Sequence, residues 1–196
     1  MTGVGTITNT AQLKLGESVL VVGLGGVGLA SILGAVAAGA TQIIAADVNP
    51  KKREFAKQLG AHFTLDSSEK GALEELKELT NGGVDVSAEF AGVIPALDFA
   101  FQATKRGGTT VTAALPDPNA KLEISPVTLV GQEKSLKGSY LGGCVPSRDI
   151  PAYVELYKTG RLAVDKLISH RIKLEEINNG FERLAKGDAL RQIILF

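Results

Sequence analysis

The chain has 196 residues, and its 21 lysines and arginines balance its 21 aspartates and glutamates, so the formal net charge is zero. This length fits one domain with an appendage and is enough to bury a substantial core. The lack of a basic surplus argues against nucleic-acid binding. A single cysteine, Cys144, excludes an internal disulfide, and no Cys/His cluster has a zinc spacing. The first residues lack a signal-peptide pattern, which favours a cytoplasmic protein.

One long uncharged stretch raises the question of a membrane helix. Residues 18–46 carry no charge over 29 positions, more than the ~20 residues that cross a bilayer. Against a membrane helix, the glycines at 23–28 would interrupt it, and its flanks, Glu17 and Asp47, are acidic with no aromatic belt. We therefore expect no membrane partner.

Up to residue 141 the chain alternates between apolar runs typical of strands and amphipathic runs typical of helices. Strands are predicted at 19–22, 42–46, 62–65, 84–90, 109–114 and 135–141, with a further short one at 121–124. Helices are predicted at 6–13, 26–38, 50–59, 70–79 and 94–104. This alternation predicts an α/β fold with a doubly wound parallel six-stranded sheet in the order 3-2-1-4-5-6, the Rossmann fold.

Local residues mark several helix ends. Gly39 is expected to cap the helix at 26–38, and Asn49-Pro50 to open the next one, since proline is favoured at the first helical position. Ser67 or Ser68 is expected to cap the helix at 70–79.

The remainder of the chain has a different pattern. One helix is predicted within 146–160, an extended piece at 169–174, a helix at 175–186 and an apolar strand at 192–196. A six-stranded sheet leaves no partner for that last strand, so we expect it to belong to another sheet. The predicted division is a dinucleotide-binding domain at 1–145 and a C-terminal segment at 146–196.

The glycine motif that follows the first strand carries the functional prediction. Gly23, Gly25 and Gly28 fit G-x-G-x-x-G between a strand and a helix, and Asp47 ends the second strand 19 residues after Gly28. The first glycine permits the turn, the second lets a pyrophosphate approach, and the third lets helix and strand pack closely. The helix N-terminus favours phosphate, and the carboxylate suits a ribose. The motif predicts dinucleotide binding.

The residues around Asp47 also bear on which dinucleotide binds. A carboxylate there would repel the 2′-phosphate of NADP, so NAD is favoured. Lys51, Lys52 and Arg53 could soften that repulsion, because they lie in the first turn of the next helix. Two alternatives stay open for these cations: they point into solvent, or they face an anion.

At this point the sequence resembles the zinc-type medium-chain alcohol dehydrogenases over its whole length, closest to the class III-like branch. The matching stretches are 2–5, 9–11, 23–29, 43–49, 81–85, 141–143, 177–181 and 191–196. The resemblance implies that an N-terminal GroES-like catalytic domain, which holds the zinc ligands, precedes the segment matched here. It therefore implies a cofactor-binding fragment that is inactive alone, with no catalytic or metal-binding residue in this chain.

The resemblance also implies roles for individual residues. The residues of the pyrophosphate loop are Gly23, Leu24, Gly25, Gly26, Val27 and Gly28. Asp47 and Lys52 would bind the adenosine ribose, and Phe90 and Ala91 would border the adenosine. Ala113, Ser139 and Leu141 would hold the nicotinamide carboxamide through backbone groups, with Thr2 beside the ring and Arg191 reaching the pyrophosphate. Members of this family pair the edge at 135–141 across a two-fold axis, which implies a homodimer.

Other residues with chemical potential have structural interpretations. Cys144 and His170 have no pattern that links them, so a packed thiol is favoured over a nucleophile. His62 is expected to pack at a strand end. Asp85 and Glu89 share a strand face and could form a catalytic pair, but the favoured interpretation is that one of them caps a helix or closes a polar contact at the sheet end.

Two rival functions remain open. One is a non-catalytic module that senses NAD(H) and signals through a partner, although no attached regulatory segment is visible. The other is a methyltransferase, which would usually carry an acidic residue near the end of the first strand, where Val21 and Val22 stand. Competition between NADH and S-adenosylmethionine separates these possibilities.

Overall fold

The computed structural model describes residues 1–196 and divides into two compact units, Met1–Leu162 and Ala163–Phe196. The first unit contains a six-stranded parallel sheet in the order β3-β2-β1-β4-β5-β6. This confirms the predicted α/β fold class and strand order. The second unit contains a two-stranded parallel sheet, β7-β8. The boundary that we predicted at residue 145, from the change of sequence pattern there, stays a prediction.

The strands are β1 (Ser18–Val22), β2 (Gln42–Ala46), β3 (Phe63–Leu65), β4 (Val84–Glu89), β5 (Thr104–Thr112), β6 (Ser135–Gly138), β7 (Ile168–Lys173) and β8 (Arg191–Leu195). The α-helices are α1 (Thr2–Gly5), α2 (Gly26–Ala38), α3 (Pro50–Gln58), α4 (Ala72–Leu79), α5 (Ile94–Ala103), α6 (Pro126–Gln132), α7 (Pro146–Lys158) and α8 (Ile177–Lys186). A π-helix, η1 (Thr6–Ala11), continues α1, and short 3-10 turns occur at η2 (Leu141–Gly143), η3 (Val164–Leu167) and η4 (Leu174–Glu176).

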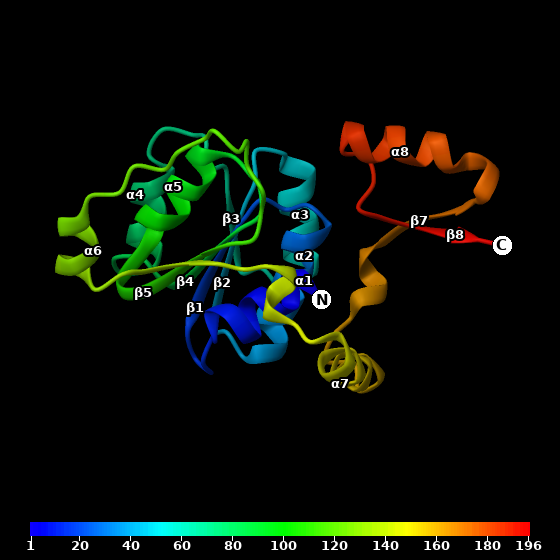
Figure 1. The fold of residues 1–196 in the computed structure, drawn as a ribbon, viewed down its shortest axis with the longest axis horizontal. Helices are drawn as coiled ribbons and strands as arrows, with labels where there is room; N and C mark the ends of the chain where they lie inside the picture. Colours follow the sequence, from blue (N-terminus) through cyan, green and yellow to red (C-terminus); the bar gives the residue numbers. More distant parts are fainter. The chain divides into compact units, whose positions relative to one another are not determined.

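The central strands are apolar because helices cover both faces of the sheet. Figure 1 shows α2 and α3 on one face and α4 and α5 on the other. Between α4, α5 and the sheet lies a core that includes Leu20, Ile44, Leu76 and Phe99. Because the six strands are parallel, their carboxyl ends all lie on the same side of the sheet, and a ligand of such a fold binds there.

Several predicted boundaries are correct for the expected reasons. The helix α2 spans Gly26–Ala38, and Gly39 follows it with φ +82°, the left-handed conformation that favours glycine. The helix α3 begins at Pro50, and the Asn49 side chain accepts a hydrogen bond from the Lys51 N–H. The last strand does belong to another sheet, since β8 pairs with β7.

Two predictions near the start of α4 and after β5 are wrong. Neither Ser67 nor Ser68 caps α4, whose N-cap is Gly71, because the Ser68 hydroxyl and N–H both donate to Asp66 Oδ1. Residues 121–124 form no strand, and the chain continues there as an irregular segment into α6, which we did not predict.

Other predicted elements exist with shifted limits. The N-terminal helical segment begins at Thr2 rather than Thr6. The strand β5 begins at Thr104 rather than Thr109, because α5 passes directly into it through an irregular pairing with β4. The strand β6 ends at Gly138, and Leu141 lies beyond it in η2 with φ +50°. No helix is long and apolar enough to span a membrane.

Candidate functional site

The three motif glycines lie in three different environments at the carboxyl end of β1. A Cβ at Gly28 would lie 1.9 Å from the Gly23 carbonyl oxygen, so the helix α2 and the turn pack too closely for a side chain. Gly23 has φ +89°, and a Cβ there would lie 2.6 Å from the Ala91 nitrogen. A Cβ at Gly25 would meet nothing within 4 Å. Gly25 therefore borders open space, whereas close packing leaves no room for a side chain at Gly23 or Gly28.

That open space lies at the N-terminus of a 13-residue helix. Gly25 is the N-cap of α2, and no side chain caps the first turn. The N–H groups of such a turn, together with the partial positive charge of the helix, favour an anion. The geometry at Gly25, Gly26 and Val27 thus fits a phosphate group that approaches the backbone.

A carboxylate lies at the same turn. Asp47 follows β2, and its Oδ2 accepts a hydrogen bond of 2.8 Å from the Leu24 N–H. Its Oδ1 accepts one of 2.8 Å from the Asn49 N–H, which fixes the carboxylate plane. Each carboxylate oxygen has a second lone pair that can accept a hydrogen bond from a ligand hydroxyl. The Lys52 ammonium lies 3.9 Å from Oδ2.

The neighbouring cations differ in their availability to a ligand. The Arg53 guanidinium forms a 3.0 Å ion pair with Asp66 and donates to the Asp47 backbone carbonyl. Lys51 is exposed, and Lys52 is half-buried beside Asp47. Of the two alternatives for this triplet, Arg53 faces an anion, but that anion is the Asp66 carboxylate of the chain itself.

A cavity of about 220 Å³ opens beside Asp47 at the carboxyl ends of β1, β2 and β4. Its lining residues include Val48, Ser67, Ala91, Val93 and Pro95. Sequence reasoning expected Ala91 here but missed Val48 and Val93. Both valines are more than half exposed and fit contact with a flat apolar ligand group.

Comparison with known proteins decides the family. Residues 26–159 match the sequence profile of zinc-binding dehydrogenases. The chain belongs to the zinc-binding dehydrogenase family. The predicted membership of the zinc-type dehydrogenases is therefore confirmed.

Curated relatives and solved structures agree with this assignment. The chain is 40% identical to alcohol dehydrogenase 1 of Zea mays over an alignment that covers 98% of this chain and 52% of that protein. It is 39% identical to alcohol dehydrogenase 1 of Solanum tuberosum, with coverages of 98% and 51%. Benzyl alcohol dehydrogenase from Acinetobacter calcoaceticus superposes with a TM-score of 0.94 at 30% identity, with coverages of 98% and 53%. The chain thus spans about half the length of these relatives.

The residues that family resemblance assigns to the nicotinamide side lie around the ends of β5 and β6. The Ala113 N–H donates to the Glu89 carbonyl at 3.0 Å, and the Ser139 N–H donates to the Thr112 carbonyl at 2.8 Å. Leu141 is half-exposed, and its φ of +50° is rare for a leucine. Such strain is often found at ligand sites.

The start of the chain packs against these segments. A Cβ at Gly142 would lie 2.6 Å from the Thr2 carbonyl oxygen, so α1 and η2 are in close contact. A Cβ at Gly3 would lie 2.1 Å from the Val27 carbonyl oxygen, so α1 also touches the first turn of α2. The fold therefore brings Thr2, Leu141 and the glycine turn together.

Two predicted residues lie differently from the rest. The Phe90 ring is not part of the cavity lining, and it packs beneath Gly28, whose ideal Cβ would lie 3.5 Å from Phe90 Cδ2. Arg191 is exposed on β8 in the second unit, so its predicted contact with the pyrophosphate stays a prediction.

Asp85, Glu89 and His62, the other residues considered above for a chemical role, have structural partners. The Asp85 carboxylate accepts hydrogen bonds from Ser18 and pairs with Lys105; burial would raise its pKa, but these donors hold it below the usual value. Glu89 accepts from the Gly92 N–H and the Thr112 hydroxyl. Both carboxylates therefore make polar contacts, whereas such a contact was predicted for only one of them. His62 Nδ1 accepts from the Ile43 N–H, also at a strand end.

Cys144 lies in a small polar cluster between η1 and α7. Its sulfur contacts the Tyr153 hydroxyl at 3.3 Å and Asn9 Nδ2 at 3.6 Å. Burial and the thiol raise the pKa of Tyr153 to about 12, whereas hydrogen bonds from Arg148 lower the pKa of Asp149 to about 2. The structure contains no group of three or more His, Cys, Asp or Glu residues that could hold a metal ion.

Proposed function

We propose that this chain is the NAD-binding part of a zinc-dependent alcohol dehydrogenase. The observation that carries the proposal is the open space over Gly25 at an uncapped helix N-terminus, with the Asp47 carboxylate fixed one strand away. The relatives named above are alcohol dehydrogenases, and one solved relative from Sinorhizobium meliloti, 26% identical, is bound to NADP. They support a nicotinamide dinucleotide as the ligand.

The residues of this chain would bind and orient the dinucleotide. The backbone N–H groups at Gly25, Gly26 and Val27 would hold the pyrophosphate, and Asp47 would accept hydrogen bonds from the adenosine ribose. The cavity between Val48 and Val93 would receive the adenine. The chemistry that the nicotinamide would supply when bound is the acceptance of a hydride from the carbon of an alcohol.

Backbone groups of Ala113, Ser139 and Leu141 would orient the nicotinamide ring, with Thr2 beside it. Ala113 and Ser139 use their N–H groups within the sheet, which leaves their carbonyl oxygens as the groups that can accept from a carboxamide. We assign no residue of this chain to zinc. We therefore expect the 196-residue chain to bind NADH but not to oxidise an alcohol.

The binding test is a fluorescence titration of the chain with NADH, followed by competition with NAD⁺ and with S-adenosylmethionine. We expect saturable NADH binding that NAD⁺ displaces and S-adenosylmethionine does not. Displacement by S-adenosylmethionine alone would favour a methyltransferase, and zinc-dependent alcohol oxidation by this chain would contradict the assignment of roles.

We also propose a homodimer through β6, supported by its position at the edge of the sheet. Ser139 N–H points toward β5, so by alternation the Leu136 N–H points outward and is free to pair with a second copy. The side chains of Val127 and Val130 in the neighbouring α6 are about 80% exposed, which fits a surface that a second copy of the chain would cover.

Leu136→Pro removes that outward donor and keeps the pairing with β5, so we expect it to convert the dimer to a monomer. Leu136→Thr is the matched control, because it keeps the N–H. Sedimentation velocity distinguishes the two species. A monomeric unsubstituted chain at high concentration, or an unchanged dimer with proline at 136, would refute the interface.

A further inference from the structure

A larger cavity, of about 660 Å³, lies at the opposite ends of the strands from the glycine turn. It is lined where α4 and α5 end, where β5 begins and where the chain enters β6. Because the six strands are parallel, these are the amino ends of the strands, whereas the glycine turn lies at a carboxyl end. The cavity is therefore separate from the candidate dinucleotide site.

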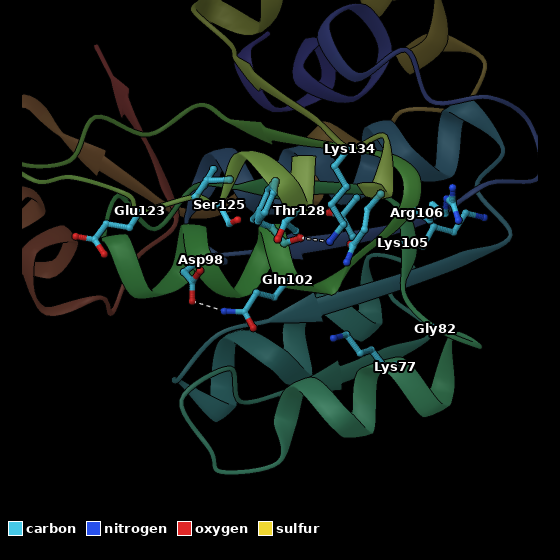
Figure 2. Close-up of a pocket in the computed structure, with 14 residues that line it drawn as sticks. Lys77, Gly82, Asp98, Gln102, Lys105, Arg106, Glu123, Ser125, Thr128 and Lys134 are labelled. Carbon is cyan, nitrogen blue, oxygen red and sulfur yellow. Dashed lines mark hydrogen bonds between the residues drawn. The ribbon is translucent and has the colours of Figure 1, made fainter. Parts of the chain in front are cut away.

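Four basic side chains line this cavity, and three of them have no acidic partner. Lys105 forms a 2.5 Å ion pair with Asp85. Lys77, Arg106 and Lys134 have no carboxylate oxygen within 4.0 Å of their charged nitrogens. Figure 2 shows the four cations, from three separate chain segments, away from Glu123, with the Arg106 side chain directed away from Lys77 and Lys134.

Lys134 is held in place by the fold rather than by an ion pair. Its ammonium donates one hydrogen bond of 2.9 Å to the Phe101 carbonyl and lies 4.9 Å from the centroid of the Phe101 ring. Two of its three N–H groups remain for a ligand. Burial lowers the pKa of Lys134, and the nearby charge of Lys77 lowers it further, so the two cations repel each other across the cavity.

The opposite end of the cavity has a different character. Asp98 and Glu123 lie there, away from the cations (Figure 2). Asp98 accepts a 2.5 Å hydrogen bond from Gln102, and its carboxylate has further lone pairs for a hydroxyl. A ligand that carried negative charge along its whole length would be repelled at this end.

We propose that this cavity binds a sugar monophosphate, with the phosphate between Lys77 and Lys134 and the hydroxyls toward Asp98. Guanidinium and ammonium groups form strong charge-assisted hydrogen bonds with phosphate. A phosphate ion alone would fill little of the volume, which lies in the range of small-molecule sites. The site requires no contribution from the dinucleotide site.

The test is calorimetric titration of the full chain with ribose 5-phosphate and, separately, with inorganic phosphate. The chain carries Gly25→Val, so that phosphate binding at the glycine turn contributes nothing. We expect saturable binding of ribose 5-phosphate with a Kd below about 1 mM. Absence of saturable heat in this background would overturn the proposal and would leave the dinucleotide site untouched.

Substitutions then test each end of the cavity. The double variant Lys77→Gln with Lys134→Gln should weaken the binding of ribose 5-phosphate by at least about 10-fold, whereas Lys158→Gln, at an exposed lysine of α7, should leave the affinity unchanged. Lys77→Gln alone is measured if the double variant does not fold. Asp98→Ala should weaken the binding of ribose 5-phosphate and leave the binding of inorganic phosphate unchanged. Equal affinities in the cation variants and in the Lys158→Gln control would overturn the site.

Discussion

Gly25→Val is expected to leave the fold intact and to weaken NADH binding by at least about 30-fold. A valine fits the backbone at this position, where φ is −76°, and its Cβ would enter open space. That space is where the pyrophosphate must approach the N–H groups of α2, so the methyl groups would displace the ligand rather than any protein atom. The measurement is NADH affinity by fluorescence, with a thermal melt for stability.

Two further glycine variants serve as controls for Gly25→Val. Gly131→Val also places a side chain in open space and should leave NADH affinity unchanged, since Gly131 lies in α6. Gly28→Ala should unfold the chain or lower its melting temperature strongly, because its Cβ would lie 1.9 Å from the Gly23 carbonyl oxygen. Normal NADH affinity in the Gly25→Val variant would show that the dinucleotide does not cross this turn.

Asp47→Ser is expected to reverse the preference between NADH and NADPH. The serine loses the carboxylate that would accept from the ribose, so NADH affinity should fall by about 10-fold, and NADPH affinity should rise by a similar factor as the repulsion of the 2′-phosphate disappears. Arg53 is neutralised by Asp66 and cannot offset that repulsion in the unsubstituted chain. Lys52, at 3.9 Å from the carboxylate, becomes free to meet the phosphate.

The measurement for Asp47→Ser is the ratio of the two dissociation constants under identical salt. Glu54→Gln removes one negative charge from the exposed surface of α3 and should leave the ratio unchanged. A ratio that stays the same in the Asp47→Ser variant would refute the role of the carboxylate in choosing the cofactor.

Much of the sheet could be predicted because its determinants are local. The apolar run at Val19–Val22, the glycine that ends α2 and the proline that begins α3 each act within a few residues. The α4 cap was mispredicted because the Ser68 hydroxyl and N–H both donate to Asp66 Oδ1, and Gly71 takes the N-cap position without a side-chain hydrogen bond. No local pattern announces that arrangement.

The site was predicted less completely than the sheet, because its parts come from distant segments. The motif identifies Gly25 and Asp47, but the cavity between Val48 and Val93 depends on how β2 and β4 are spaced in the sheet. Likewise, nothing in the sequence indicates that Lys77 and Lys134 share one cavity. The ion pair of Arg53 with Asp66 also appears only when α3 and β3 pack together.

The most direct measurement is a crystal structure of the chain grown with NAD⁺. We expect a pyrophosphate on the N–H groups of Gly25, Gly26 and Val27, and a ribose whose hydroxyls donate to Asp47. A dinucleotide bound elsewhere, or an Asp47 side chain turned away from the sugar, would contradict this expectation.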